Sequence, residues 1–459
     1  MLNRLIILGC MFIVTLGCSP NGNTESATVV AAAAVTVPDT DQPKTLFTNV
    51  QVFDGVNETL AAVDVLIQGN LIQEVGANIE APGATVIDGG GRTLMPGLID
   101  MHAHLCIQEG MLVGRDGYDQ MAMGARTAKS MLQYLDQGFT TARDVGCNVL
   151  GVAKAVNNGL IDGPRIYPAG GFLSQTGGHA DTGSFNDVPG RVDDLERHGF
   201  GYIVDGKTEI RRAARQNLRS GATHIKLMAG GGVASEFDPL HSTQFSVEEF
   251  ETAVEVAKDY GTYVTVHAYH DRSVNRAIDA GVRCIEHNFL VSEDTIIRMK
   301  KEGIALSVQA VMSLEAFGDP ESITFFNADQ KAKATLVNTG ASNMMKMARK
   351  HGLLMVTGGD MFGPAYNGRQ ADNMTILTTL GYTPIEILRM GTSNAAEVLS
   401  WSGGMNPYKY GTLGTIAAGG YADMILLDGN PLEDVNVIKN YADGFKVIMK
   451  DGKVWKNTL

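Results

Sequence analysis

Two histidines separated by one residue follow an apolar segment, and this short motif is the first sign of chemistry in the chain. His102 and His104 come directly after the run 94–100. Side chains two positions apart on a strand point to the same face, so both imidazoles can reach one divalent metal ion. Taken alone, such a motif is more often a pair of ordinary, partly buried histidines.

Four further residues of types that bind metals lie near the ends of later apolar runs. They are, in chain order, Lys226, His267, His287 and Asp360. In an α/β barrel the active-site groups collect at the carboxyl ends of the strands, so residues distant in the sequence can share one site. The order of these residues therefore predicts one site that also contains the two histidines.

In this order the six positions resemble the metal-dependent amidohydrolase superfamily, in which strand one carries His-x-His, strand four Lys, strands five and six one His each, and strand eight Asp. Within this superfamily, the sequence is most similar in character to the imidazolonepropionase-like branch, which includes Xaa-Pro dipeptidases. The resemblance implies two divalent metal ions, with zinc expected and manganese or cobalt left open. It also implies N6-carboxylation of Lys226, whose carbamate would bridge the ions. It assigns His102, His104, Lys226 and Asp360 to one ion, and Lys226, His267 and His287 to the other.

The same resemblance implies hydrolysis. A water or hydroxide shared by two cations has its pKa pulled towards neutrality, which gives a nucleophile at pH 7. Asp360 would take its proton and pass it to the leaving amine. Mononuclear members that open imidazolone rings or deaminate bases generally lack the bridging lysine, so Lys226 favours a two-metal hydrolase. We therefore expect an exported amidohydrolase that cleaves amide C–N bonds of dipeptides or N-acyl amino acids, like an Xaa-Pro dipeptidase.

Other functions stay open at this point. One is an imidazolonepropionase-like cyclic amidase. Another is a lactone or phosphotriester hydrolase on the same two-metal core, which would act on uncharged esters without a free carboxylate. A non-catalytic surface lipoprotein that uses the barrel only for binding is the third, although the filled set of ligand positions argues against it.

Substrate recognition rests on weaker patterns. A free α-carboxylate would need a polar or cationic side chain near the mouth of the barrel. We expect His179 and Tyr269, which follow predicted strands, to face the substrate. Five further residues are placed similarly but could have ordinary structural roles, such as an ion pair between neighbours 143 and 144: Arg143, His241, His270, Arg272 and Arg369.

The elements that must position these side chains recur along the chain. Beside the run before His102, apolar runs lie at 139–146, 165–174, 223–230, 263–269, 284–290, 305–312 and 354–361. Mostly amphipathic segments separate them, such as 247–260 and 294–302. Eight strands that alternate with helices predict an α/β fold, a (β/α)8 TIM barrel over residues 95–412. Insertions after strands three, four and eight lie where substrate choice is normally set.

Strand-like alternation also occurs at both ends of this region. Residues 45–94 and 413–459 contain short alternating runs bounded by glycine turns. Neither piece could form a stable sheet by itself. We expect them to combine into one small composite β-sandwich, a domain that often flanks the superfamily barrel.

The N-terminus indicates export. Arg4 precedes an apolar run over 5–17, which is shorter than the ~20 residues that a spanning helix needs. Residues 1–18 are therefore expected to be an export signal. The small, polar composition of 19–44 predicts a flexible linker.

Gly17 before Cys18 also resembles a bacterial lipobox, although Thr15 stands where that pattern usually has Leu. Lipidation at Cys18 is expected, with simple cleavage of the signal as the alternative. Ser19 after the cysteine would fit outer-membrane sorting. The expected location is thus the periplasm or, as an anchored lipoprotein, the outer membrane of a Gram-negative bacterium.

The net charge of the chain limits the kinds of molecule that it is expected to bind. The net charge is −13 and no basic tract occurs, which argues against nucleic acid. The expected partner is a small molecule or dipeptide, with membrane contact only through the lipid anchor; the oligomeric state stays open.

Three cysteines lie beyond the signal, Cys106, Cys147 and Cys284, and they lack the spacing of a zinc module. Cys106 and Cys147 could meet in an oxidising compartment, but buried free thiols are expected.

Overall fold

The computed structural model shows how these segments fold. It describes residues 42–108, 119–188, 190–361, 363, 366 and 368–459. The predicted signal, its lipidation site Cys18 and nearly all of the predicted linker lie outside the described residues. Among the residues that are described, no helix is both long and apolar enough to cross a membrane.

Parallel strands occupy the middle of the chain. A three-stranded sheet has the order β10-β9-β8, and a seven-stranded sheet has the order β12-β11-β13-β14-β15-β16-β17. Every pairing in both sheets is parallel. The strands are β8 (Leu98–Ala103), β9 (Phe139–Asp144), β10 (Arg165–Pro168), β11 (Phe172–Ser174), β12 (Gly201–Ile203), β13 (Ile225–Met228), β14 (Val264–His270), β15 (Cys284–Leu290), β16 (Ala305–Val308) and β17 (Met355–Thr357).

All eight apolar runs are strands, as predicted, but the run 165–174 is divided. Its first part, β10, pairs with β9, and its second part, β11, pairs with β12 and β13. Gly170 and Gly171 separate the two parts. One predicted strand therefore contributes to both parallel sheets, because the chain turns from one to the other within it.

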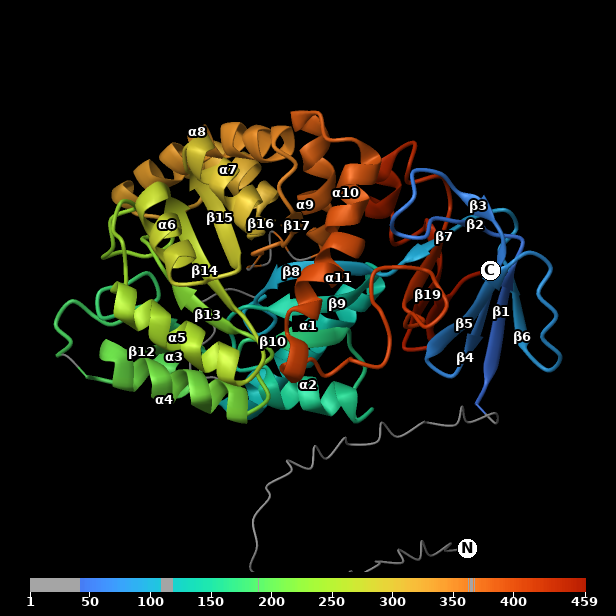
Figure 1. Cartoon of the computed structure of the whole chain (residues 1–459), viewed down its shortest axis with the longest axis horizontal. Coiled ribbons are helices and arrows are strands. Elements are labelled where there is room, and N and C mark those ends of the chain that lie inside the picture. The colour runs from blue at the N-terminus through green and yellow to red at the C-terminus, as the bar shows by residue number, and fades with distance from the viewer. Residues whose placement is uncertain (1–41, 109–118, 189, 362, 364–365, 367) are drawn as a thin grey trace, which may run out of the picture. The chain divides into compact units, whose positions relative to one another are not determined.

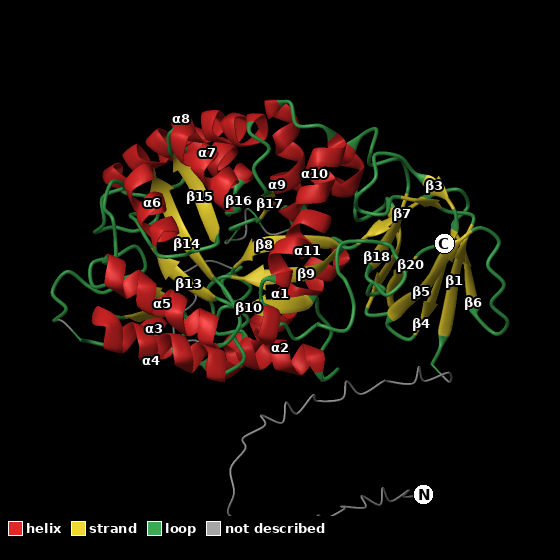
Figure 2. Ribbon diagram, viewed as in Figure 1, coloured by secondary structure: helices red, strands yellow, loops and turns green. Residues whose placement is uncertain are grey.

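Helices connect and cover the strands (Figures 1 and 2). The predicted amphipathic segments 247–260 and 294–302 form α5 and α7, and capping boxes begin α5 at Ser246 and α8 at Asn327. The longer helices are α1 (Gln120–Asp136), α2 (Leu150–Asn157), α4 (Gly206–Arg219), α5 (Val247–Asp259), α6 (Asp271–Asp279), α7 (Glu293–Glu302), α8 (Ala328–Lys350) and α11 (Ser393–Ser400); α3 (Asp194–Arg197), α9 (Gln370–Thr375) and α10 (Pro384–Met390) are shorter.

Strands from the two ends of the described chain lie side by side, blue beside red in Figure 1. A six-stranded sheet has the order β20-β19-β18-β7-β2-β3, in which three strands from the C-terminal end join three from the N-terminal end through the pairing of β18 with β7; a four-stranded sheet has the order β5-β4-β1-β6. The strands are β1 (Lys44–Thr48), β2 (Gln51–Val52), β3 (Ala61–Ala62), β4 (Asp64–Gln68), β5 (Leu71–Gly76), β6 (Thr85–Asp88), β7 (Thr93–Pro96), β18 (Met424–Leu427), β19 (Phe445–Lys450) and β20 (Lys453–Asn457).

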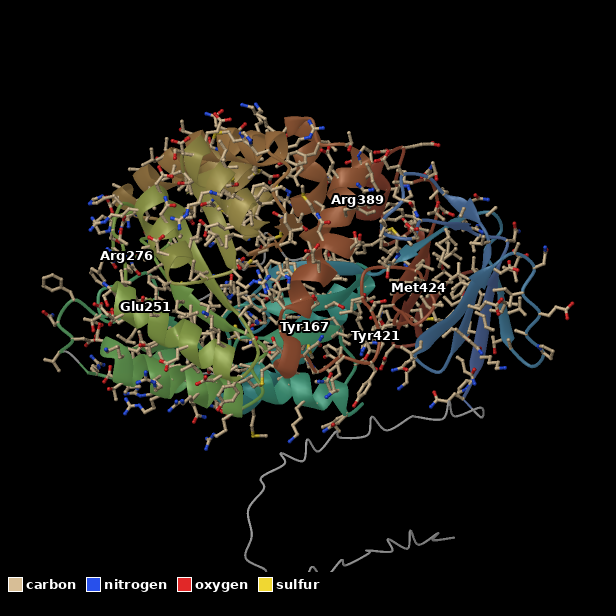
Figure 3. The ribbon with its side chains drawn as sticks, in the orientation of Figure 1. Tyr167, Glu251, Arg276, Arg389, Tyr421 and Met424 are labelled. Carbon is tan, nitrogen blue, oxygen red and sulfur yellow. A yellow bond between two sulfur atoms is a disulfide. The ribbon has the colours of Figure 1, made fainter. Side chains whose placement is uncertain are left out.

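These two sheets share one apolar cluster. Phe47 and Val65 belong to the four-stranded sheet. They pack in this cluster against Leu94, Met424 and Val447 of the six-stranded sheet. Met424 is labelled in Figure 3 at the start of β18. Burial of these side chains supplies the main stabilisation of such a cluster, so neither end can keep its apolar face covered without the other.

A buried ion pair joins the parallel sheets to the terminal strands. Arg165 on β10 contacts Asp423, which directly precedes β18, at 2.7 Å between Nε and Oδ2. Its guanidinium also lies over the ring of Tyr421, labelled in Figure 3, at 3.8 Å from the centroid. Only Gly97 separates β7 of the terminal sheet from β8 of the parallel sheet. The terminal sheet is therefore joined to the parallel sheets both by this ion pair and by the continuous chain through Gly97.

The prediction of buried free thiols at Cys106 and Cys147 is wrong. Their sulfur atoms form a disulfide, with the Cα atoms 6.0 Å apart. Cys106 follows β8 and Cys147 follows β9, and these are neighbouring parallel strands whose carboxyl ends lie together. Of the described cysteines, Cys284 on β15 is the free, buried thiol.

Replacing both disulfide cysteines by serine should lower the free energy of unfolding by about 2–4 kcal/mol, because the unfolded chain loses a cross-link over 41 residues. The denaturant midpoint, measured with and without reductant, tests this. Reductant should lower the midpoint of the wild type and leave the Cys106→Ser/Cys147→Ser variant unchanged. Two free thiols at these positions in protein unfolded without reductant would contradict the bond.

Candidate active site

His102, His104 and Asp360 meet at the carboxyl ends of β8 and β17. One ligand atom from each lies within 4.8 Å of the other two. Nε2 of His104 is 3.2 Å, and Nε2 of His102 is 3.5 Å, from the same carboxylate oxygen of Asp360. Two ring nitrogens and one oxygen thus point at a common space, as a metal ion would require.

Both imidazoles are held at the opposite nitrogen. Nδ1 of His104 is 2.8 Å from the carbonyl oxygen of Gly146, and Nδ1 of His102 is 2.8 Å from Oε2 of Glu286. A hydrogen bond from Nδ1 leaves Nε2 as the nitrogen with a free lone pair. This is the support that metal-binding histidines normally have from a carbonyl or a carboxylate.

The carboxylate of Asp100 fastens the strand that carries these histidines. It accepts hydrogen bonds from the backbone nitrogens of His102 and Gly359, each at 2.9 Å, and from the hydroxyl of Tyr134 at 3.0 Å. Beside it, the backbone nitrogen of Asp360 donates to the carbonyl oxygen of His102 at 2.7 Å. The first and last predicted ligands are therefore joined through backbone groups as well as through side chains.

The other two predicted histidine ligands continue the cluster. His267 on β14 and His287 on β15 have ring centroids 4.4 Å apart, and the ring of His287 is 5.1 Å from that of His102. Nε2 of His267 lies 3.3 Å from the carbonyl oxygen of Gly231, which leaves Nδ1 for another partner. All four histidines thus occupy one continuous, buried group.

Unusual backbone conformations occur at two of the predicted ligands. His287 has a φ of 73° and Asp360 a φ of 50°, a region that residues other than glycine seldom adopt. In a regular strand the consecutive residues Glu286 and His287 would point to opposite faces. Here Glu286 contacts His102 while the ring of His287 also lies beside His102. The left-handed turn at His287 is what allows both side chains to reach the same site.

Lys226 on β13 is 1% exposed. Among the described residues, no hydrogen bond or ion pair accompanies its Nζ. Burial lowers the pKa of Lys226 to about 8, against the opposing fields of Glu286 and Asp360. An ordinary structural lysine is paired when it is this deeply buried, so a lysine without such a partner needs another explanation.

The protonation states of the predicted ligands suit cation binding. Burial acts to raise the pKa of Asp360, but His102 and His104 hold that pKa below its usual range. Burial also lowers the pKa of His102 to about 4. At neutral pH the carboxyl is ionised and this imidazole is neutral, which are the forms that bind metals.

The two residues predicted to face substrate do lie at this site. The ring of His179 stacks on that of His267 at 4.0 Å, and its Nδ1 is 2.7 Å from the hydroxyl oxygen of Ser235. The ring centroid of Tyr269 is 4.9 Å from that of His267 and 5.3 Å from that of His287. The structure therefore brings both residues against the predicted metal ligands.

The glycine-rich segment after β13 passes close to the ring of His179. A Cβ atom at Gly232 would stand 1.9 Å from the His179 ring, so no larger residue fits there. Further from the cluster, Arg369 forms ion pairs with Glu315 and Asp372. That arginine thus has a structural role, and it is not merely solvated.

The interpretation of Arg143 and Asp144 as an ion pair is wrong. Nη2 of Arg143 contacts Oε1 of Glu286 at 2.6 Å, and both side chains have no exposed surface. Asp144 instead accepts from the backbone nitrogens of Leu105 and Gly146. Glu286 was not among the residues predicted for the site. The available signal was a carboxylate next to His287 within a buried strand.

The fold and the site together define an α/β enzyme whose polar groups gather at the carboxyl ends of parallel strands. Residues 93–454 match the model of the amidohydrolase family, and this chain belongs to that family.

Known proteins of similar sequence and structure include amide hydrolases. Ochratoxinase of Aspergillus niger is 31% identical over 430 residues, which cover 88% of this chain and 84% of that protein. The crystal structure of a prolidase complexed with N-methylphosphonate-L-proline is 32% identical, with a TM-score of 0.81, and covers 90% of this chain and 100% of that one. An Xaa-Pro dipeptidase with bound methionine is 27% identical, with a TM-score of 0.79 and the same coverage.

Proposed function

We propose that this enzyme hydrolyses the amide bond of dipeptides or N-acyl amino acids at a site with two divalent metal ions. The observation that carries the proposal is the convergence of two Nε2 atoms, each fixed through Nδ1, on one carboxylate oxygen of Asp360. The similarity to a prolidase, an Xaa-Pro dipeptidase and ochratoxinase supports an amide substrate.

The donor groups fit such a pair of ions. His102, His104 and Asp360 would hold one ion, and His267 and His287 the other. Lys226, which is buried without a described partner, would join both through a carbamate, formed when its neutral amine adds to carbon dioxide and releases a proton. When bound, the ions would polarise the amide carbonyl and lower the pKa of water towards neutrality. We expect zinc, since imidazole and carboxylate ligands suit it.

The residues of the chain have distinct tasks in this proposal. The ionised carboxylate of Asp360 accepts a proton from the attacking water and returns it to the nitrogen of the leaving amine. His179 and Tyr269, which stand against His267, contact the substrate. Glu286 and Gly146 keep the rings of His102 and His104 in place.

We also propose the finer architecture that such a site requires. The two parallel sheets would close into a (β/α)8 barrel over residues 95–412. Support comes from the backbone hydrogen bond between Asp360 and His102 and from one between Thr223 and Pro168, which link the two sheets. The two terminal sheets would form the composite β-sandwich of 45–94 and 413–459, supported by their common apolar cluster.

A screen of purified protein against dipeptides and N-acyl amino acids, with metal analysis, tests the proposed function. Asp360→Asn should lower kcat on the best substrate by ~10²-fold or more, because the shape stays while the base is lost. Asp279→Asn, which removes an exposed ion-pair partner of Arg298, is the matched control and should keep normal turnover. Wild-type turnover in Asp360→Asn with its metal retained would exclude the proposed base. Hydrolysis of lactones or phosphotriesters alone would replace the amidase proposal.

Lys226→Ala should lose most activity and about half of the bound metal, because one ion would keep only two protein ligands, fewer than the three typical of catalytic zinc. Metal content per chain and turnover measure this. Acetate or formate should restore part of the activity by supplying bridging oxygens, whereas a structural lysine would not respond. Full metal content with near-normal turnover in Lys226→Ala would rule out the carbamate.

We further propose that the enzyme is exported and anchored through a lipid on Cys18, on the basis of the apolar run and the Gly17-Cys18 pair. Cys18→Ala should leave an unprocessed or misplaced precursor whose metal content is unchanged. Palmitate labelling and cell fractionation measure this. Labelling that persists in Cys18→Ala would contradict the lipid site.

A further inference from the structure

A fully buried ion pair lies directly behind His102. Arg143 comes from β9 and Glu286 from β15, and the two side chains meet at 2.6 Å with no exposed surface. A buried pair of this kind seldom adds net stability, because removing both charges from water costs about as much as their attraction returns. Its position next to a predicted ligand therefore calls for a different explanation.

Both oxygens of the Glu286 carboxylate are engaged. Oε1 accepts from Nη2 of Arg143 and from the hydroxyl of Thr265, while Oε2 lies 2.8 Å from Nδ1 of His102. The three partners come from three different strands. The carboxylate is thereby fixed in one orientation, with one oxygen facing the imidazole.

The guanidinium is fixed as firmly. Nε of Arg143 donates to the carbonyl oxygen of Met101 at 2.6 Å, and Nη1 donates to the hydroxyl of Tyr263 at 3.2 Å. Met101 is the residue before His102. Arg143 thus holds the backbone of the ligand strand with one nitrogen and the carboxylate beneath the ligand ring with another.

Two neighbours of His102 contact the same ring nitrogen, one as a hydrogen-bond acceptor and the other as a donor. Glu286 can only accept a hydrogen bond at Nδ1. The amide nitrogen of Gln309, which lies 3.2 Å from Nδ1, can only donate. Oε1 of Gln309 is already occupied by the backbone nitrogen of His287 at 3.1 Å, so this amide is not free to reverse. The nearer, charged acceptor forms the stronger bond and places the proton on Nδ1.

We propose that Arg143 and Glu286 are positioning residues that select the tautomer of His102 in which Nε2 can bind a metal ion. Glu286 accepts the Nδ1 proton, and Arg143 keeps the carboxylate charged and correctly turned. Without them, Gln309 would donate to Nδ1 and the proton would move to Nε2, which closes that nitrogen to the ion. This inference rests on the metal site of the proposed function.

Glu286→Gln tests the inference, because it keeps the size of the side chain and removes the charged acceptor. Zinc affinity of the purified protein, measured by competition with a chromophoric chelator, should fall 10- to 100-fold for the more strongly affected ion, the usual range for partners of metal-binding histidines. The absorption spectrum of the cobalt-substituted protein should change as well. Unchanged zinc affinity in a folded Glu286→Gln protein would overturn the inference.

A matched control removes a similar ion pair elsewhere. Asp423→Asn disturbs the buried contact with Arg165, at 2.7 Å, which touches none of the predicted ligands. We expect it to unfold at lower denaturant concentration and to keep wild-type zinc affinity. An equal loss of zinc affinity in Asp423→Asn would show that any destabilisation weakens binding, which would overturn the specific role of Glu286.

An exchange of the two side chains gives a sharper test. In Glu286→Gln/Gln309→Glu the carboxylate moves to the side of His102 where Gln309 stood, while the composition and net charge stay the same. An acceptor is again present at Nδ1, so part of the zinc affinity should return relative to Glu286→Gln. A purely structural ion pair would not be rescued, because Arg143 remains separated from its partner.

If the Gln variants do not fold, Glu286→Asp serves instead, since it keeps the charge beside Arg143 but withdraws the carboxylate from His102 by one methylene. It should fold and bind zinc more weakly, and wild-type affinity would overturn the inference. Outcomes for the wild type separate the two proposals. A wild type that binds zinc and cleaves no amide refutes the proposed substrate only. A wild type that binds no zinc refutes both.

Discussion

The contact between the strand ends β8 and β17 is the constraint on which the site depends. The first and the last of the predicted ligands come from strands that are distant in sequence, and they meet only because the backbones of Gly358 and His102 approach closely. A Cβ atom at Gly358 would stand 2.3 Å from Cβ of His102, so the approach requires glycine. Asp100 then bonds to both strands through backbone nitrogens. Sterics and hydrogen bonds together, not side-chain attraction alone, set the spacing of the ligands.

Around this contact the protein buries several ionisable groups wholly or in part, and each group compensates differently for the lost contact with water. Glu286 has Arg143 and an imidazole, and Asp100 has two backbone nitrogens and a phenol. Asp360 has the edges of two histidine rings. Lys226 forms no such hydrogen bond or ion pair with the described residues. Groups that are fully hydrogen-bonded in this way rigidify a site.

Local patterns explain why much of this could be predicted from the sequence. Apolar runs predicted the parallel strands, and the spacing of His102 and His104 predicted their common face, because both patterns depend on a few neighbouring residues. The partner of Arg143 could not be predicted, since the contact with Glu286 depends on which strands lie together in the assembled fold. The side on which His287 lies could not be predicted either, because the left-handed turn at His287 reverses the expected alternation on β15. The disulfide was missed because it depends on which loops are neighbours, a property of the assembled sheet.

The terminal sheet has a consequence for the order of events during synthesis. Strand β7 pairs with β18, with Pro96 opposite Met424, and only Gly97 separates β7 from the strand that carries His102. A ribosome must therefore release most of the chain before the final neighbour of β7 exists. Contacts of such long sequence separation form slowly, because the entropy of closing the intervening loop is lost first. The ligand strand is made early but gains its full support late, and until then its apolar edge needs protection from aggregation.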